Sequence, residues 1–270
     1  MTTEDWKGLP EIDYEVLQLF PNFTKEDIIQ KAREIREKSL STDFYCCIDG
    51  LHFLKFGLKH NPFYGEVFQE GKLSELRILD IGCCFGVDIR GLILDGADIN
   101  NVFGIDLSDS LISLGFELFG DAERLKGHFI EADATSKDFV NTVSEKTGGK
   151  FDLIILQLVL HTVADSGALL IQNVFRLLNT GGKLIGCTLG TEEDLDEELK
   201  VGVGRRRRFI HSERTLSRLF SSCGFTNITV KFCKWNPQKW SVGWIENNFS
   251  FSLKNECLGF LIFRCMNVEF

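Results

Sequence analysis

Two different periods of apolar residues divide the chain near Leu73. Before that residue, the stretch NFTKEDIIQKAREIREKSL has apolar side chains at helical spacing, acidic residues in its first turn and Thr24 as a helix N-cap. After it, short apolar runs alternate with helical stretches, which is typical of parallel βαβ units. We therefore expect residues 1–72 to form an N-terminal helical extension that serves as a lid, and residues 73–270 to form an α/β domain.

The apolar runs of the second part predict five parallel strands and an antiparallel pair. The first five runs are almost continuously apolar, as expected of strands that helices cover on both faces. Two later runs, NITVKFCKW and ECLGFLIFRCM, have between them only a loop, which contains Trp240 and Trp244, and parallel neighbours would need a longer return path. The predicted fold is α/β, with a Rossmann-like open, mostly parallel seven-stranded sheet and an antiparallel C-terminal edge pair. The five parallel strands are expected at Arg77–Ile81, Asn101–Asp106, His128–Ala132, Asp152–Leu156 and Lys183–Leu189.

The composition indicates a globular protein of the cytoplasm. The 270 residues are long enough to bury a full core. No apolar stretch approaches the roughly 20 residues of a membrane helix, and the first residues, MTTEDWKGLP, lack the pattern of a secretory signal, so we expect no membrane partner. The nine cysteines lie mostly in apolar runs without CxxC spacing, which predicts buried reduced thiols and no metal site.

The net charge of −9 disfavours a broad contact with nucleic acid, whose phosphates bind excess Lys and Arg. One local exception is the basic run RRRR at Arg205–Arg208. Such a run is either a solvated face or a local site for an anion.

Three of the predicted parallel strands are followed by residues typical of a nucleotide site, and in an open sheet their carboxyl ends face the ligand. At the first strand, Asp80, Gly82 and Gly86 form D-x-G-x-x-x-G, where backbone N–H groups at the helix start can face a ligand. Asp106, twenty residues after Gly86, suits the two hydroxyls of a ribose. Asp133, just past the third strand, is suitably placed for the amino group of an adenine.

The fourth strand carries Gln157 at its end and His161 in the following turn. Cys84 stands where a dinucleotide loop needs a further glycine close to the pyrophosphate. A ligand with an adenosine and no phosphate tolerates Cys84 better. This pattern favours S-adenosyl-L-methionine over NAD.

At these residues the chain resembles the class I S-adenosylmethionine-dependent methyltransferases. The motifs LDIGCCFG, GIDLS, EADA, FDLIILQLVLH and LLNTGGKLIG stand in the order and spacing of that family. The departure is Cys84 in place of the middle glycine. The resemblance implies S-adenosyl-L-methionine as the cofactor. It also implies a set of cofactor-binding residues, namely Asp80, Gly82, Cys83, Cys84, Phe85, Gly86, Arg90, Asp106, Leu107, Asp133, Ala134 and Gln157.

A narrower likeness extends from about Tyr45 to His161. The runs YCCIDGLHFLKFGLKHNPFYGEV, CCFGVDIRGLILDGA and LGFELFGD are similar to fungal meroterpenoid methyltransferases of secondary metabolism, which esterify a carboxyl group. In a competing likeness, the runs FDLIILQLVLHT and GGKLIGCT are similar to messenger RNA cap guanine-N7 methyltransferases. The acidic balance of the chain argues against that substrate, whereas the RRRR run leaves it open.

The chemistry of the acceptor decides which side chains the reaction needs. A carboxylate is already ionised at neutral pH and needs no base, whereas a phenol or alcohol gains from one. His161 is the predicted base or orienting donor, with a structural histidine as the alternative. His60 and Tyr64 are candidates from the lid, and Arg90 would either bind a carboxylate of the cofactor or substrate or simply pair on the surface. Late tryptophans suited to an apolar acceptor pocket are Trp235, Trp240 and Trp244.

The sequence thus favours a methyltransferase that methylates a carboxylate or hydroxyl oxygen of an apolar small molecule. One alternative is methylation of an RNA cap. The other is a methyltransferase-like fold that serves as a binding protein without catalysis.

Overall fold

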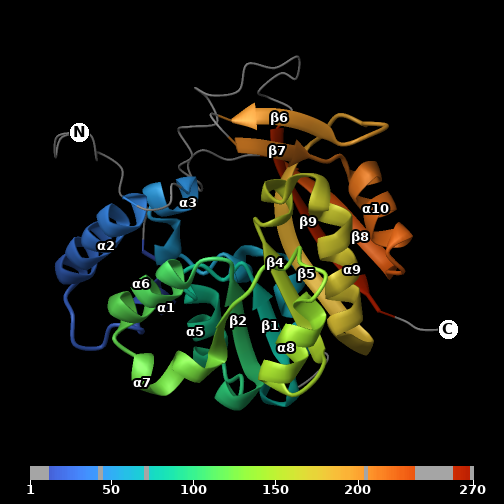
Figure 1. Cartoon of the computed structure of the whole chain (residues 1–270). Coiled ribbons are helices and arrows are strands. Elements are labelled where there is room, and N and C mark those ends of the chain that lie inside the picture. Colours follow the sequence, from blue (N-terminus) through green and yellow to red (C-terminus); the bar gives the residue numbers. More distant parts are fainter. Residues whose placement is uncertain (1–11, 42–44, 70–72, 204–205, 235–257, 268–270) are drawn as a thin grey trace.

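The computed structural model describes residues 12–41, 45–69, 73–203, 206–234 and 258–267. Its main sheet has seven strands in the order β3-β2-β1-β4-β5-β9-β8 (Figure 1). Strands β1 to β5 are parallel, and β9 lies antiparallel between β5 and β8. The predicted fold, including the antiparallel C-terminal pair, is therefore confirmed. The strands are β1 (Ile78–Ile81), β2 (Val102–Asp106), β3 (Phe129–Glu131), β4 (Phe151–Gln157), β5 (Leu178–Thr191), β8 (Thr226–Lys234) and β9 (Leu258–Met266).

Two further strands, β6 (Leu199–Val203) and β7 (Arg206–Ile210), pair antiparallel outside the main sheet and were not expected. The arginine run continues into β7, and its charges interrupt the apolar pattern that reveals a strand. Arg208 is only 8% exposed, so a solvated face is the wrong interpretation for this residue. Arg205 and the side chains of Arg206 and Arg207 lie outside the described residues.

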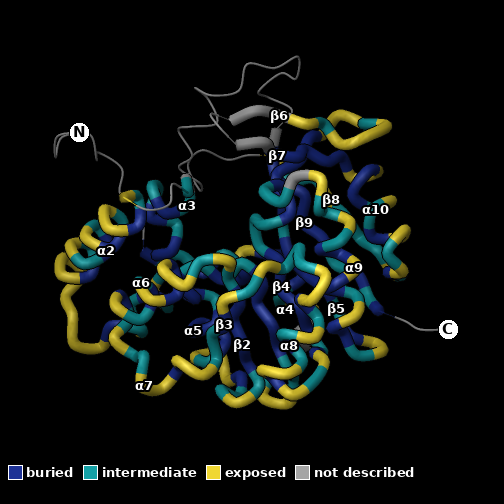
Figure 2. Tube along the Cα trace, in the orientation of Figure 1, coloured by how far each residue is buried: buried dark blue, intermediate teal, exposed yellow. Residues whose placement is uncertain are grey.

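Helices cover both faces of the sheet, which explains the continuous apolar strands. Ile154 and Leu156 pack toward helices α8, α9 and α10. Leu153 and Ile155 point the other way and pack with residues of α4 and α5. Figure 2 shows the central strands of the sheet as buried segments between these layers, whereas the edge strand β8 has no buried residue. The helices are α4 (Phe63–Gln69), α5 (Val87–Leu94), α8 (Phe139–Thr147), α9 (Gly167–Leu177) and α10 (Glu213–Ser222).

The N-terminal helices pack directly onto the α/β domain. Thr24 caps α2 as predicted, because its hydroxyl accepts the N–H of Asp27 and the Asp27 carboxylate accepts the N–H of Thr24. The apolar faces of this segment form one cluster with Phe85 and with Leu111 of α6. The helices of this side are α1 (Tyr14–Leu17), α2 (Lys25–Leu40), α3 (Cys46–Asp49), α6 (Asp109–Phe119) and α7 (Ala122–Leu125). No helix among the described residues is long and apolar enough to cross a bilayer.

The closest approach between α6 and the loop after β1 occurs at Gly115. A Cβ atom there would lie 2.4 Å from the carbonyl oxygen of Phe85. We expect Gly115→Ala to lower the free energy of unfolding by about 1–3 kcal/mol, because the helix must move away from that backbone. Gly65→Ala is the matched control, since a Cβ on Gly65 of α4 meets nothing within 4 Å and alanine favours a helix. Urea denaturation measures both, and equal effects of the two changes would contradict this account.

Candidate functional site

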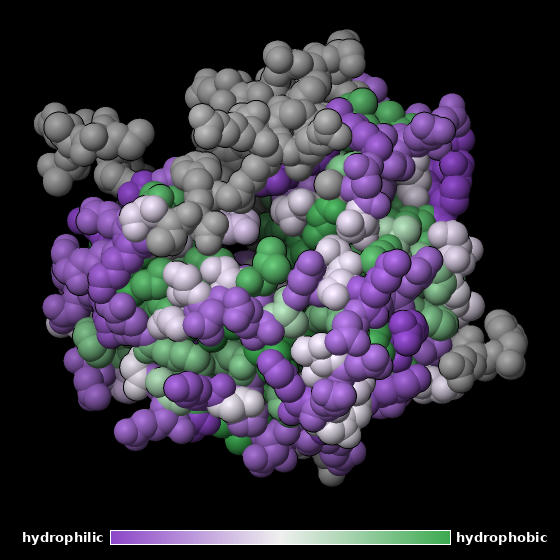
Figure 3. Space-filling view, viewed as in Figure 1, coloured by the Kyte–Doolittle hydropathy of each residue, from purple (hydrophilic) through white to green (hydrophobic). Residues whose placement is uncertain are grey.

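A cavity of about 260 Å³ lies at the carboxyl ends of β1, β2 and β4. Residues 45–57 of the N-terminal segment contribute its opposite wall. Figure 3 shows apolar surface in the middle of this face of the molecule, beside the grey atoms. The strand ends therefore bring together most of the predicted cofactor residues. Those that line the cavity are Asp80, Gly82, Cys83, Cys84, Phe85, Asp106, Leu107, Asp133, Ala134 and Gln157.

The loop after β1 keeps the conformation of a glycine-rich turn despite Cys84. The backbone of Cys84 is left-handed, with φ of 52°, and its N–H donates to the Asp106 carboxylate at 2.8 Å. The N–H groups of Gly82 and Cys83 both donate to the carbonyl of Ile105. A non-glycine residue in this region costs about 1–2 kcal/mol. Cys84 thus adopts the left-handed backbone that favours glycine, at the cost of local strain.

Asp106 connects this loop to the end of β2. Its second carboxylate oxygen accepts the N–H of Ser108 at 3.1 Å. An ionised carboxylate has about four acceptor positions, so Asp106 retains capacity for ligand hydroxyls. The next residue, Leu107, is 64% exposed and lines the same cavity, where it offers an apolar surface to a flat ring.

Asp80 and Gln157 present buried polar groups to the cavity. Asp80 is 3% exposed and lines the cavity. Burial, followed by the charges of Asp88 and Asp106, raises the pKa of the Asp80 carboxyl. Both amide atoms of Gln157 are buried and lack partners among the described residues. Buried polar groups nearly always have hydrogen-bond partners, so these two fit a polar, cationic ligand.

Asp88 also lines the cavity, although the sequence analysis does not single it out. It lies in the first turn of α5, where an acidic residue is common at any helix start. Its carboxylate accepts the N–H of Leu58 at 3.2 Å and so joins α5 to the N-terminal segment. Burial raises the pKa of Asp88 to about 6, and the bond from Leu58 opposes this shift.

Four residues of the opposite wall were also missed, because this wall depends on the packing of a distant segment. These residues lie in the run YCCIDGLHFLKFGLKHNPFYGEV, whose likeness to other methyltransferases does not indicate which of its side chains face a cavity. They include Tyr45, Cys47, His52 and Lys55.

Arg90 has a structural position and lies outside the cavity lining. It is 2% exposed and forms a two-fold ion pair with Asp121, with both N–O distances at 2.7 Å. Its remaining terminal nitrogen donates to the carbonyl oxygens of Phe85 and Gly86 at 2.7 and 2.9 Å. Arg90 therefore forms an ion pair, but this pair is buried and does not lie on the surface as the alternative expected, and Arg90 supports the carbonyls of the loop. Gly86 likewise belongs to the loop and not to the cavity lining.

His161 is buried beneath the cavity and does not line it. Its Nδ1 lies 3.5 Å from the hydroxyl of Thr188. Burial, with the charges of Arg208 and His211, lowers the pKa of His161 to about 3, so the ring is uncharged at neutral pH. This position favours the structural alternative over a catalytic base.

The two lid candidates also point away from the cavity. Nε2 of His60 lies 3.3 Å from the carboxylate of Asp13, and the Tyr64 hydroxyl donates to Asp95. Burial, with this bond to Asp95, raises the pKa of Tyr64. Neither side chain faces the carboxyl ends of the strands. The candidate tryptophans, Trp235, Trp240 and Trp244, lie outside the described residues.

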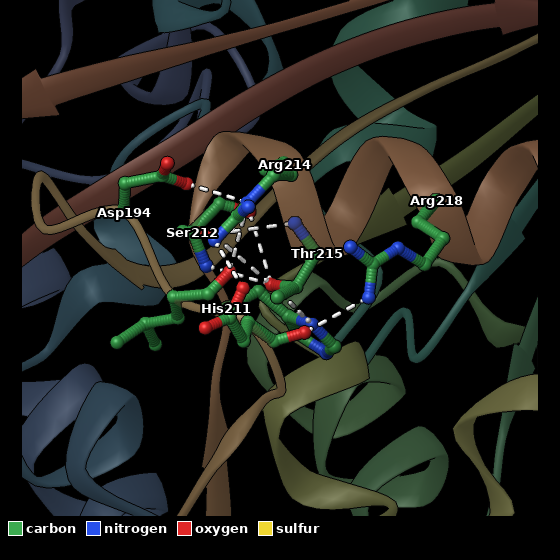
Figure 4. A network of polar contacts seen from close by, with 8 residues as sticks. Asp194, His211, Ser212, Arg214, Thr215 and Arg218 are labelled. Carbon is green, nitrogen blue, oxygen red and sulfur yellow. Dashed lines mark hydrogen bonds and ion pairs between the residues drawn. The ribbon is translucent and has the colours of Figure 1, made fainter.

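A second cavity of about 360 Å³ borders α10. Figure 4 shows the network of polar contacts at the start of this helix. Arg214 pairs with the Asp196 carboxylate at 2.8 Å, and Arg218 donates to the Asp196 carbonyl at 2.9 Å. Nδ1 of His211 lies 3.4 Å from the Thr215 hydroxyl, and burial lowers the pKa of His211 to about 4. These contacts hold α10 against the loop before β6.

Comparisons with known proteins agree with this geometry. A family described as a methyltransferase domain matches residues 29–230. Methyltransferase adrK of Penicillium roqueforti is 31% identical over 146 residues, which are 54% of this chain and 51% of adrK. O-methyltransferase atr3 of Stereocaulon alpinum is 32% identical over 165 residues, which are 57% of this chain and 47% of atr3. The matched segments thus span about half the length of these curated relatives.

Solved structures share the fold at low identity. A Burkholderia thailandensis enzyme, 1,6-didemethyltoxoflavin-N1-methyltransferase with bound S-adenosylhomocysteine, superimposes with a TM-score of 0.53. It is 16% identical, and the match covers 92% of each chain. At this identity the likeness extends to the fold alone.

Replacing Arg90 should destabilise the loop after β1 that this side chain supports. We expect Arg90→Lys to lower the free energy of unfolding by about 3 kcal/mol, because lysine cannot reproduce the planar fork that holds Asp121 and two carbonyls. Chemical denaturation measures the loss. Arg124→Lys, at an exposed position of α7, is the control and should change stability by less than about 0.5 kcal/mol. A similar stability of both variants would contradict the structural role.

His161 should make the protein sensitive to mild acid. Its pKa is about 3 in the folded chain and about 6.5 when unfolded, so the unfolded chain takes up the proton first. Stability is therefore full above about pH 6.5 and falls as the pH drops toward 3. The raised pKa of Asp88 changes the stability in the opposite direction over this pH range. The wild type is therefore compared with the variant His161→Gln, in which the effect of Asp88 is still present. We expect the free energy of unfolding of the wild type, relative to that variant, to fall by about 2 kcal/mol from pH 7 to 4.5. A difference that does not change with pH would rule out this contribution.

Proposed function

Since the chain belongs to the methyltransferase domain family, we propose that it transfers the methyl group of S-adenosyl-L-methionine to a carboxylate or hydroxyl oxygen of an apolar small molecule. The observation that carries this proposal is the pairing of Asp80 and Gln157 in one cavity. Both amide atoms of Gln157 are buried without a partner among the described residues, and Asp80, at the end of the neighbouring strand, is a carboxyl that is only 3% exposed. Such groups cost stability unless a ligand satisfies them.

The residues of the cavity fit the parts of this cofactor. The Asp106 carboxylate suits the ribose hydroxyls, and Asp133 and Ala134 lie where an adenine would need contacts. Leu107 offers an exposed apolar side chain to the same ring. Asp80 suits the cationic part, since a nearby positive charge stabilises its ionised form. When bound, the cofactor supplies a methyl group on a positively charged sulfur.

The protein contributes to catalysis mainly by position and exclusion of water. Apolar walls around a small cavity hold the two reactants in contact, and such positioning can supply effective molarities of about 10⁵ M or more. A carboxylate acceptor arrives ionised, so no side chain has to remove a proton. This agrees with the position of His161 outside the cavity. A hydroxyl acceptor would need a base, and His52 is the imidazole that lines the cavity.

Two observations support a small molecule over an RNA cap. The net charge is −9, and Arg208 of the basic run is buried and so cannot contact an extended phosphate chain. The name of the relative atr3, an O-methyltransferase, supports oxygen as the accepting atom. Membership of the methyltransferase domain family likewise favours a catalytic protein over a binding protein.

Two substitutions test the cofactor site by isothermal titration with S-adenosyl-L-methionine. Asp106→Asn should weaken binding by tenfold or more, about 1.4 kcal/mol. Gln157→Leu should weaken binding and also raise the stability of the protein without ligand, because it removes a buried amide that has no partner.

Asp109→Asn, at an exposed position in the first turn of α6, is the control and should bind like the wild type. Absence of binding heat in the wild type would overturn the proposal. Unchanged affinity in both cavity variants would show that the cofactor binds elsewhere.

A further inference from the structure

The lining of the cavity contains both acidic and basic side chains, and they come from different parts of the chain. The wall formed by the sheet and α5 has four carboxyl groups, those of Asp80, Asp88, Asp106 and Asp133, and no lysine or arginine among its described residues. The wall formed by residues 45–57 has no carboxyl group among the residues that line the cavity. Lys55 is the single lysine or arginine among all the described lining residues.

Lys55 lines the cavity, whereas the residues on either side of it do not. It directly follows a 3-10 helix, His52–Leu54, and its backbone is extended, with φ of −130° and ψ of 143°. Leu54 and Phe56 are each 1% exposed and pack into the core of the N-terminal segment. The N–H of Phe56 donates to the Asp13 carboxylate at 3.0 Å, which fixes this segment of the chain.

We propose that Lys55 is a specificity-determining residue that selects an anionic acceptor and holds its charged end near the donor. This inference rests on the proposed function. The four carboxyl groups suit a cationic donor, and Lys55 suits an anion on the opposite wall. A neutral alcohol of the same skeleton gains nothing from the ammonium group of Lys55.

The reaction removes both charges at once. A carboxylate oxygen forms a bond to the methyl carbon while the carbon–sulfur bond breaks and its electron pair stays on sulfur. A neutral ester and a neutral thioether result, with no proton to transfer. Lys55 therefore acts on the bound acceptor and its orientation, and it needs no change of its own protonation state.

Lys55 also has a structural neighbour. Its charge contributes, after the bonds from His60 and Phe56, to lowering the pKa of Asp13 against the effect of burial. A loss of stability alone would thus be uninformative. The ratio of affinities for an acid and its matched alcohol is informative, because a structural change affects both ligands alike.

The test uses the full chain saturated with S-adenosylhomocysteine and two matched ligand pairs, farnesoic acid with farnesol and cinnamic acid with cinnamyl alcohol. Isothermal titration should give at least one acid that binds tenfold or more tightly than its alcohol. Lys55→Met keeps the apolar stem and should reduce that ratio below about threefold, whereas Lys55→Arg keeps the charge and should retain most of it. Lys59→Met is the matched control, since Lys59 lies in the same segment, pairs with Asp95 and Glu15, and does not line the cavity.

Three results overturn the inference: neither acid is preferred over its alcohol, the preference survives Lys55→Met, or Lys59→Met abolishes it equally. The proposed function has a separate readout in the same titrations. If the wild type binds neither S-adenosylmethionine nor S-adenosylhomocysteine, the proposed function itself fails. If it binds them without any preference for acids, the failure is confined to the role of Lys55.

Discussion

The buried guanidinium of Arg90 is the interaction on which the cofactor loop depends. A charge that is 2% exposed is tolerated only when its hydrogen-bonding groups are satisfied, and here Asp121 and the carbonyls of Phe85 and Gly86 satisfy them. The same carbonyls belong to the turn that leads from β1 into α5, in which Cys84 is left-handed. Arg90 therefore stabilises a strained loop from the side opposite to the ligand. The sequence pattern places an arginine one turn after the loop but does not reveal which side of the loop it faces.

The N-terminal segment completes the site because it is attached at several points. Asp88 accepts a hydrogen bond from Leu58, the amide of Asn61 donates to the carbonyl of Gly186 at 3.0 Å, and Asp13 accepts the N–H of Phe56. The first bond joins the segment to α5, the second joins it to β5, and the third links two parts of the segment itself. Phe85, at the centre of the cofactor loop, lies in the same apolar cluster as the N-terminal helices. We propose that residues 1–72 act as a lid in this sense, as a fixed wall that completes the cavity.

The predictable features are those that local periodicity and chain order determine. Apolar runs located every strand of the main sheet within a few residues, and the strand ends identified Asp106 and Gln157 as lining residues. The hairpin of β6 and β7 was missed because arginines mask its pattern. The sequence predicts His161 in the cavity because a turn after a strand end indicates which residues lie near the site. It does not indicate which way their side chains point. Lys55 could not be found, since its role follows from the packing of segments far apart in the sequence.

Buried polar atoms without a partner occur both at the cavity and elsewhere among the described residues. Away from the cavity, Arg264, Asn173 and Asn267 each leave one buried atom without a partner, but Arg264 also donates to Glu66, and the two amide nitrogens donate to backbone carbonyls. In Gln157 both amide atoms lack partners, and Asp80 is a nearly buried acid. Natural sequences break local rules mainly at functional sites, where ligand binding offsets the cost. The strained Cys84 in the same wall follows this rule. The buried polar groups of the cavity thus lower the stability of the protein without ligand, and a charged ligand would satisfy them.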